Sequence, residues 1–517
     1  MPAAYLCGID VGTTNTKATL ISDDGAVLAE ASEPSRINQR GPGWVEQDPD
    51  EMAAAAERVL GECVRQAGVD PARVAGIAIT GQMAGVASVD ADWNPVTPYD
   101  SWLDTRCDPY VAVMRRRADS IIAASGGPPT YSHGPKMLWW KHEYPEIFRR
   151  IHKFVMPAAY VAGRLADLTG DQAFIDPTYL HFSCLADIRA QAWSEELCSH
   201  FEIPMEKLPR IVEPSDVVGR LSREAAARVG LVSGIPIVAG AGDQSAAMLG
   251  AGVIRPGIGY DAAGTASSFA LCVPGFSPDV AHKTLVTGRL PAPGLWYALG
   301  YINGGGLNLR WLRDMLRALP AGGSSCGGMG LDYAQLDDLA SRVPPGSDGL
   351  VFVPHLGGRV CPNQPNVRGA WVGLRWSHST GHLYRALLES VAYEYSIYLD
   401  IEQRLAPDVA FHEVRVVGGG SQSALWNQLK ADVLGVPYTR LNRSEAGSLG
   451  AAILAGYGIG VFRDLEAAVS AFVHPVERFE PRPEKRELYR PFAAFYRNLL
   501  EEYAGLWEGV ASLSLSR

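Results

Sequence analysis

The sequence predicts a mixed α/β fold made of two large domains. Three observations support this prediction. The chain has 517 residues, of which 47% are hydrophobic and 20% charged, so it can bury at least two ordinary cores. Strand and helix signals alternate in both halves, as in mixed sheets covered by helices. A Gly-x-Asp segment followed by Gly-Thr occurs at 8–13 and returns, slightly altered, at 259–265, as two copies of one architecture would produce.

The first predicted element is a β-hairpin. Residues 5–10 form a short apolar run that ends in an acid, and a Gly-Thr-Thr turn at 12–14 follows. Residues 18–21 are largely apolar again, and the polar residues 22–25 supply the next turn. Two apolar runs separated by small turn-forming residues are typical of a hairpin.

A helix and a strand are predicted next. Asp48 and Pro49 form a typical helix start, with an N-cap residue followed by proline at the first helical position. Residues 52–66 are rich in alanine, place apolar residues on one face and stop at Gly68. The apolar run at 74–79 predicts a strand, so the order is strand, helix, strand.

The same signals recur late in the chain. Residues 413–417 predict a strand that ends in three glycines. A helix is expected over about 424–434, with Ser421 able to cap its start and Gly435 closing it. Mixed sheets covered by helices are therefore expected in both halves.

We place the domain boundary near residues 250–256, where glycine-rich sequence precedes the second Gly-Thr segment. The main feature expected at the end of the chain is one long helix over about 484–507, with its aromatic residues facing the core. The Gly- and Ser-rich stretch at 320–330 is interpreted as a mobile surface loop. This division predicts an N-terminal domain over 1–252, a C-terminal domain over 253–475 and a closing helix within 476–517.

Composition and charge exclude several classes of protein. The net charge is −10, and Lys and Arg are scattered rather than gathered into the basic stripe of a nucleic-acid-binding protein. The N-terminus lacks an export signal, and no stretch reaches the ~18 uncharged apolar residues of a membrane helix. The eight cysteines include no C-x-x-C pair, and we interpret them as reduced thiols. We expect a cytoplasmic protein with a small-molecule partner, no nucleic acid and no membrane.

The turn at 10–17 has the residue types that phosphoryl transfer requires. That reaction needs backbone N–H groups to hold phosphates, an acid to hold magnesium and a base beside the acceptor hydroxyl. The turn combines glycine, hydroxyl side chains and a carboxylate, Asp10, that can hold a hydrated metal ion. The alternative is an ordinary hairpin turn with a solvated aspartate.

Two further turns are weak evidence for nucleotide binding alone, but they support it together with the turn at 10–17. Residues 261–268 repeat the Gly-Thr pair followed by hydroxyl residues, although a plain serine-rich loop would look the same. Gly418, Gly419 and Gly420 lie between a strand and a helix, where a helix N-terminus can receive a purine or phosphate. A lone triple glycine is also a common turn.

Asp243 is the candidate base. Residues 238–242 form an apolar strand with two spaced glycines, and Asp243 follows just before an alanine-rich helix. A carboxylate at such a cleft edge is partly desolvated, which favours general-base behaviour. The alternative is that Asp243 is only the N-cap of that helix.

As a set, these segments resemble the FGGY carbohydrate kinases, members of the actin-like ATPase superfamily. The most specific segment is 369–374, followed after seven residues by 382–389, which is similar to the second signature of that family. Other matching segments, besides the opening hairpin, are 44–49, 81–83, 242–244 and 445–452. The resemblance implies an α/β fold of two actin-like (ribonuclease H-like) ATPase domains with a deep interdomain cleft.

The resemblance also implies roles for the matching residues. It makes Asp243 the catalytic base, and Asp10 and Asp243 the groups that hold Mg²⁺. The residues it implies for binding ATP are Thr13, Thr14, Asn15, Lys17, Gly264, Thr265, Gly418, Gly419 and Gly420. Those it implies for binding the substrate are Gln82, Met83, Asp104, Arg106, Tyr131 and Gln244. The implied reaction transfers the γ-phosphate of ATP to a hydroxyl of a small sugar, with ATP and Mg²⁺ as cofactors.

The resemblance defines the acceptor less closely than the reaction. The xylulokinase-like course of the chain favours a pentulose such as xylulose, but such members usually have histidine where this chain has Ala84 and asparagine where it has Gln244. Gln244 after Asp243, and Tyr131 five residues before Lys136, are instead similar to glycerol kinases. The alternatives are therefore a glycerol or tetritol (erythritol) kinase and, from another class, a non-catalytic sugar-binding regulator on the same fold.

We expect the sugar at the floor of the cleft, MgATP above it, and domain closure that excludes water. The chain contains no Walker-type G-x-x-x-x-G-K-S/T motif, which argues against the P-loop class. A homodimer is common among similar proteins, although the sequence itself does not decide the oligomeric state.

Overall fold

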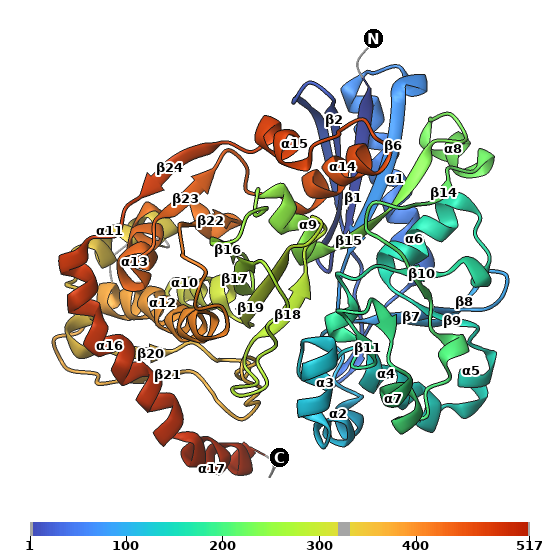
Figure 1. Ribbon diagram of the computed structural model, residues 1–517. Helices are drawn as coiled ribbons and strands as arrows, with labels where there is room; N and C mark the ends of the chain where they lie inside the picture. Colours follow the sequence, from blue (N-terminus) through green and yellow to red (C-terminus); the bar gives the residue numbers. More distant parts are fainter. Residues whose placement is uncertain (1–3, 319–330, 515–517) are drawn as a thin grey trace.

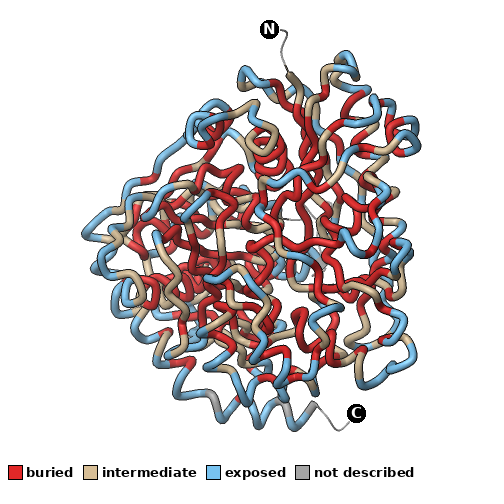
Figure 2. Tube along the Cα trace, turned by 45° about the vertical axis from the view of Figure 1, so that its right-hand side comes forward, coloured by how far each residue is buried: buried red, intermediate tan, exposed pale blue. Residues whose placement is uncertain are grey.

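The computed structural model describes residues 4–318 and 331–514, which form two α/β halves side by side (Figure 1). Buried positions are concentrated inside both halves (Figure 2). The stretch at 320–330, interpreted above as a surface loop, lies outside the described residues. Within the described part of the chain, no helix is long and apolar enough to cross a membrane, and seven cysteines are buried free thiols.

The N-terminal half is built on a six-stranded mixed sheet. In spatial order its strands are β14 (Val217–Arg220), β15 (Pro236–Gly242), β6 (Val74–Gly81), β1 (Tyr5–Val11), β2 (Asn15–Ser22) and β3 (Val27–Pro34). The predicted opening hairpin is confirmed, because β1 and β2 pair antiparallel with Asp10 opposite Lys17. β1 and β15 both run parallel to β6, so the carboxyl ends of these three strands meet at one edge.

Helix α1 (Pro49–Ala67) covers one face of this sheet. Its start is as predicted: the Asp48 side chain accepts a hydrogen bond from the backbone N–H of Asp50, and proline occupies the first helical position. Gly68 ends the helix in the left-handed conformation, with φ of 61°.

Two helices that are distant in sequence, α9 (Asp243–Gly250) and α14 (Gly447–Gly458), meet on the other face. α14 packs on β1 and β6 although it follows the C-terminal sheet strands β16 (Ile258–Ala263) and β22 (Glu413–Val417) in the chain. Figure 1 shows it in orange-red beside the blue strand β1. The two helices cross at backbone contact. A Cβ on Gly450 would lie 1.9 Å from the carbonyl oxygen of Ala246, and one on Gly250 would lie 2.0 Å from that of Ala446.

A smaller sheet and a set of helices complete the N-terminal half. The sheet consists of β4 (Asn38–Gly41), β5 (Trp44–Gln47), β8 (Pro95–Asp100), β7 (Val86–Val89) and β9 (Lys153–Val155). The helices are α2 (Asp108–Arg115), α3 (Ala118–Ser125), α4 (His133–Glu143), α5 (Pro145–Arg150), α6 (Pro157–Ala166), α7 (Glu195–His200) and α8 (Arg223–Val229).

The C-terminal half is built on a seven-stranded sheet. In spatial order its strands are β18 (Val286–Arg289), β19 (Trp296–Ile302), β17 (Ser267–Val273), β16 (Ile258–Ala263), β22 (Glu413–Val417), β23 (Tyr438–Leu441) and β24 (Pro475–Phe479). The surrounding helices include α10 (Gly305–Ala318), α11 (Tyr333–Ser341), α12 (Thr380–Leu405), α13 (Ala424–Leu434) and α15 (Leu465–Phe472), and β20 (Val351–Val353) pairs with β21 (Ala370–Val372).

Two late elements differ from the prediction. Ser423, and not Ser421, caps α13: its side chain accepts from the backbone N–H of Trp426, because residues 419–422 first make a 3₁₀ turn. The single closing helix is replaced by two, α16 (Pro483–Glu502) and α17 (Ala504–Ser514), which follow β24. The face of α16 that carries Tyr489 and Tyr496 is buried against α12, as expected for core-facing aromatic residues.

Candidate active site

A cavity of about 840 Å³ is lined by residues of both halves. Its wall includes the turn between β1 and β2, the start of α9, the turn between β16 and β17, and the glycines after β22. The lining residues that the sequence analysis singled out are Asp10, Thr14, Asn15, Lys17, Asp243, Gln244, Gly264, Thr265, Gly418, Gly419 and Gly420. The structure thus gathers one predicted base, two predicted metal ligands and all but one of the predicted ATP-binding residues around one space.

Asp243 lies at the wall of this cavity, directly after the end of β15. It is the first residue of α9, and Gly242 holds the N-cap position, so the alternative in which Asp243 is the cap of this helix is wrong. Its Oδ1 accepts a hydrogen bond from the backbone N–H of Gln244 (2.6 Å). Burial raises the pKa of Asp243 to about 8, and the charge of Asp10 adds to the rise.

Asp10, the second acid of the cavity, has charged neighbours of both signs. Burial raises its pKa to about 6, an effect that Lys17 opposes and Glu445 reinforces. Its Oδ1 is buried and has no hydrogen-bond partner among the described residues. Two carboxylates that line one cavity, one of them with an unpaired oxygen, suit a divalent cation. Its further ligands would come from phosphates and water, because the described residues hold no cluster of three or more metal-binding side chains.

A buried turn that the sequence analysis missed holds the two strand ends at the site. The hydroxyl of Thr178 accepts from the backbone N–H of Gly242 (2.8 Å) and donates to Asp176 Oδ1 (2.5 Å). The hydroxyl of Tyr179 lies 3.1 Å from the carbonyl oxygen of Gly81 and 3.3 Å from that of Ala241. The Asp-Pro-Thr-Tyr run at 176–179 signals a turn in the sequence, but nothing in it identifies the partners.

The predicted substrate residues Gln82 and Met83 follow β6. Gln82 is buried, and its side-chain oxygen accepts from the hydroxyl of Thr13 at 2.9 Å. Thr13 also accepts from the indole N–H of Trp102 and is absent from the cavity lining. The side chain of Met83 packs against Gly242, directly before the candidate base.

Arg106 lies between two aromatic rings, with its Cζ 4.4 Å from the ring centroid of Trp44 and 4.5 Å from that of Trp139. Three buried carboxylates pair with its guanidinium at 2.8–3.0 Å: Glu46, Asp100 and Asp104. Burial raises the pKa of Asp100 to about 7, while Arg106 and Lys136 oppose the rise. The polar atoms of Arg106 and Asp104 are directed to protein groups, and the sugar contact implied for them stays a prediction.

The other two substrate candidates also have protein partners. Tyr131 lies with its hydroxyl 3.1 Å from Asp108 Oδ1, to which it donates. The side-chain oxygen of Gln244 accepts from the hydroxyl of Ser268, in β17 of the other half, at 3.1 Å. Gln244 therefore connects the start of α9 to the C-terminal sheet.

The second Gly-Thr turn is organised differently from the first. Asp261 holds the position in β16 that Asp10 holds in β1, yet it is fully buried and paired with Lys430, which is also fully buried. The hydroxyl of Tyr395 donates to the same carboxylate (3.0 Å), and Lys430 Nζ lies 3.9 Å from the ring centroid of Trp426, which lines the cavity. The second aspartate is thus neutralised inside the protein, whereas Asp10 borders the cavity.

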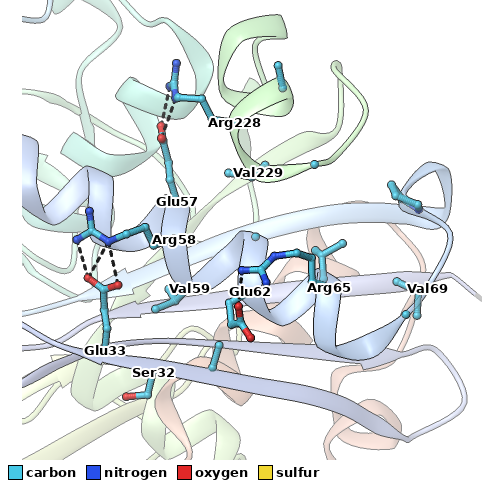
Figure 3. A pocket seen from close by; sticks show the side chains of 17 residues that line it. Ser32, Glu33, Glu57, Arg58, Val59, Glu62, Arg65, Val69, Arg228 and Val229 are labelled. Atoms are coloured by element: carbon cyan, nitrogen blue, oxygen red, sulfur yellow. Dashed lines mark hydrogen bonds and ion pairs between the residues drawn. The ribbon is translucent and has the colours of Figure 1, made fainter.

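A second hollow, of about 860 Å³, lies between α1, β3 and the end of α8 (Figure 3). Its charged residues pair with one another, and the pairs drawn in Figure 3 are Arg58 with Glu33, Arg65 with Glu62, and Arg228 with Glu57. None of the predicted site residues lines it. The cavity that contains Asp10 and Asp243 is therefore the candidate active site.

Comparison with known proteins gives concordant matches along the chain. Residues 5–250 match the N-terminal domain, and residues 262–459 the C-terminal domain, of the FGGY family of carbohydrate kinases. A xylulose kinase of Staphylococcus epidermidis is 29% identical over 506 residues, covering 97% of this chain and 97% of the relative. A glycerol kinase of Citrifermentans bemidjiense is 32% identical over 503 residues, covering 94% and 97%. The crystal structure of xylulose kinase from Rhodospirillum rubrum superimposes with a TM-score of 0.86 at 29% identity, covering 98% of this chain and 100% of that one.

Proposed function

The chain belongs to the FGGY family of carbohydrate kinases, and we propose that it transfers the γ-phosphate of ATP to a hydroxyl of an uncharged sugar, a pentulose such as xylulose. The observation that carries this proposal is the pair of Asp243 and Asp10 at the carboxyl ends of β15 and β1, in a cavity shared by both halves. The full-length similarity to a xylulose kinase supports the choice of acceptor.

We assign Asp243 the role of general base. Its pKa of about 8 means that the carboxylate binds a proton more tightly than an exposed aspartate does, which suits a group that must take the proton of an acceptor hydroxyl. The clamp from Thr178 and Tyr179 fixes the strand end that precedes it. Such fixed placement of reacting groups is the main contribution that a protein makes to phosphoryl transfer.

Asp10 and Asp243 would hold Mg²⁺ together with the phosphates of ATP, and the ion would neutralise the charge that develops during transfer. The fit rests on the unpaired Oδ1 of Asp10 and on the carboxylate of Asp243 in the same cavity, whose pKa is raised by burial and by the charge of Asp10. Lys17, which lies opposite Asp10 in the β1–β2 hairpin and pairs with Glu445 across the two halves at 2.5 Å, places a positive charge there that opposes the rise in the pKa of Asp10.

For ATP, we propose that Thr14, Asn15 and Lys17 face the phosphates from one half and that the glycines of the other half surround the nucleotide. Gly418 has a φ of 84°, and a Cβ there would lie 2.8 Å from the carbonyl oxygen of Ala263. The glycine is therefore needed for the chain to turn this close to the β16–β17 turn. The resulting backbone surface at the start of residues 418–420 suits a phosphate or a purine edge.

The charges at the acceptor end favour an uncharged acceptor. Arg106 is engaged by three carboxylates, and Lys136 is buried with its Nζ donating to the carbonyl oxygen of Asp104 (2.8 Å). Neither cation is free to pair with the carboxylate of a sugar acid. The two features that favour glycerol, Tyr131 and Gln244, also have protein partners, so we rank glycerol and erythritol below a pentulose.

The test is consumption of ATP by the purified protein with Mg²⁺ and one of D-xylulose, L-xylulose, D-ribulose, L-ribulose, glycerol, erythritol, gluconate or no acceptor. We expect turnover with one pentulose, and its loss in Asp243→Ala at unchanged fold by circular dichroism. Turnover only with a polyol would move the assignment to a glycerol or tetritol kinase, and turnover with gluconate would contradict the charge argument. Binding of a sugar without turnover on any acceptor would favour the non-catalytic regulator.

A further inference from the structure

A line of hydrogen bonds joins the acceptor end of the site to the turn that faces the nucleotide. The indole nitrogen of Trp102 lies 2.8 Å from the Thr13 hydroxyl, which lies 2.9 Å from Gln82 Oε1. Gln82 Nε2 lies 2.8 Å from Gln47 Oε1, and Gln47 Nε2 lies 3.2 Å from the carbonyl oxygen of Arg36. Five separate segments of the N-terminal half therefore meet in one chain of polar groups.

The direction of this chain is fixed at both ends. An indole N–H can only donate, so the Thr13 oxygen accepts from Trp102, and the single hydroxyl proton of Thr13 goes to Gln82 Oε1. At the far end a backbone carbonyl can only accept, which orients the two glutamine amides in the same sense. Thr13 thus has no proton left for a phosphate, whereas the exposed hydroxyl of Thr14 borders the cavity.

The same turn is tied to the end of β3 on its other side. Ser35 Oγ donates to the carbonyl oxygen of Gly12 (2.9 Å), and the backbone N–H of Ser35 donates to that of Thr14 (2.8 Å). The Thr13 hydroxyl adds the tie to the acceptor side. Because Gln82 and Gln47 are almost completely buried, this tie is shielded from water, and an unpaired group there carries a large desolvation penalty.

We propose that Thr13 is a positioning residue. Its hydroxyl holds the turn that faces the nucleotide in a fixed position relative to Gln82 and Trp102 at the acceptor end of the site, and it thereby couples use of ATP to phosphorylation of the sugar. In the productive reaction the sugar oxygen bonds to the γ-phosphorus as the bond to the ADP oxygen breaks, and Asp243 receives the hydroxyl proton. In the unproductive reaction a water oxygen takes the place of the sugar oxygen. Loss of this fixed position lowers the first rate more than the second, because only the first requires two bound substrates to be aligned.

This inference rests on the proposed function, and its test measures sugar phosphate formed per ATP consumed, with and without the acceptor. Thr13→Val keeps the shape and removes the hydroxyl, and Thr13→Ser restores it. We expect Thr13→Val to lower the acceptor-dependent kcat about tenfold, to lower acceptor-free hydrolysis by a smaller factor, and therefore to reduce the product yield per ATP. Thr13→Ser should stay within about threefold of wild type on the same scale.

Thr16→Val is the matched control, because Thr16 is buried in the same hairpin and its hydroxyl lies 3.3 Å from Ser35 Oγ, outside the chain. Trp102→Phe removes the donor end, and its effect on kcat should be non-additive with that of Thr13→Val. If Thr13→Val does not fold, as judged by thermal melting, Trp102→Phe carries the test by the same yield measurement.

Equal yields per ATP in Thr13→Val and Thr13→Ser, or an equal loss of yield in Thr16→Val, would overturn the proposal. Additive effects of Thr13→Val and Trp102→Phe would also overturn it, because the groups would not act as a unit. Failure of the wild-type protein to phosphorylate any acceptor is a distinct result that refutes the proposed function itself.

Discussion

The charged form of Asp243 should lower the free energy of unfolding at alkaline pH, and replacing Asp243 with asparagine should remove that loss. In the folded chain the pKa of Asp243 rises from its ordinary value of 3.8 to about 8, chiefly through burial. Between those two pH values the folded state therefore binds one proton more than the unfolded state, and the free energy of unfolding falls as the pH rises. At 1.36 kcal/mol for each pH step, the loss is at most about 6 kcal/mol above pH 8.

Asparagine resembles the neutral acid and does not titrate. Asp243→Asn and wild type should therefore have similar unfolding free energies near pH 4, where Asp243 is protonated in the folded state and half protonated in the unfolded one. The advantage of the variant should grow by about 1.4 kcal/mol for each pH step above that and reach several kcal/mol at pH 9. Urea titrations followed by tryptophan fluorescence at pH 5, 7 and 9 measure the difference, with Asp92→Asn as an exposed control. A difference that is the same at pH 5 and pH 9 would refute the reasoning, since an unburied carboxylate would behave that way. The same variant should lose sugar phosphorylation.

Three further substitutions test other parts of the structure. Gly450→Ala places a Cβ 1.9 Å from the carbonyl oxygen of Ala246 where α9 and α14 cross, and we expect a loss of about 3 kcal/mol or more in calorimetry; an unchanged melting temperature would contradict the packing. Lys430→Met leaves the buried carboxylate of Asp261 unpaired and should cost about 3–5 kcal/mol, most of which the double variant with Asp261→Asn should recover. Tyr179→Phe removes the donor to two strand-end carbonyls and should lower kcat about tenfold with little change in the KM for ATP; an unchanged kcat would show that this clamp does not position the base.

Features with a local cause could be predicted from the sequence. The opening hairpin depends on two apolar runs around a short turn, and the start of α1 depends on Asp48 followed by proline. A glycine-rich strand end followed by an acid is also a local pattern, and it predicts the place of Asp243 at the end of β15, whereas its role as base stays a prediction. The family resemblance extended these local patterns to an acceptor class and to an interdomain cleft.

Features that depend on distant partners could not be predicted. Thr178 bonds to a backbone group 64 residues away, and nothing near it in the sequence marks that contact. The same is true of Lys430, whose partner Asp261 lies 169 residues earlier, and of Arg106, which two tryptophans from different segments enclose. Even the local prediction for Ser421 failed, because a helix can start one short turn later without any change in composition.

The position of α14 has a consequence for how the chain is made. The apolar face of β1 and β6 receives α14 only after the ribosome has added the roughly 200 residues that separate the end of α9 from the end of that helix. At 5–20 residues per second this takes on the order of 10–40 s, during which Leu6 and Ala78 lack their final neighbours. A nascent chain that stalls in this interval exposes the apolar face of β1 and β6, which chaperones can bind. Synthesis of the C-terminal half is therefore also the step that completes the core of the N-terminal half.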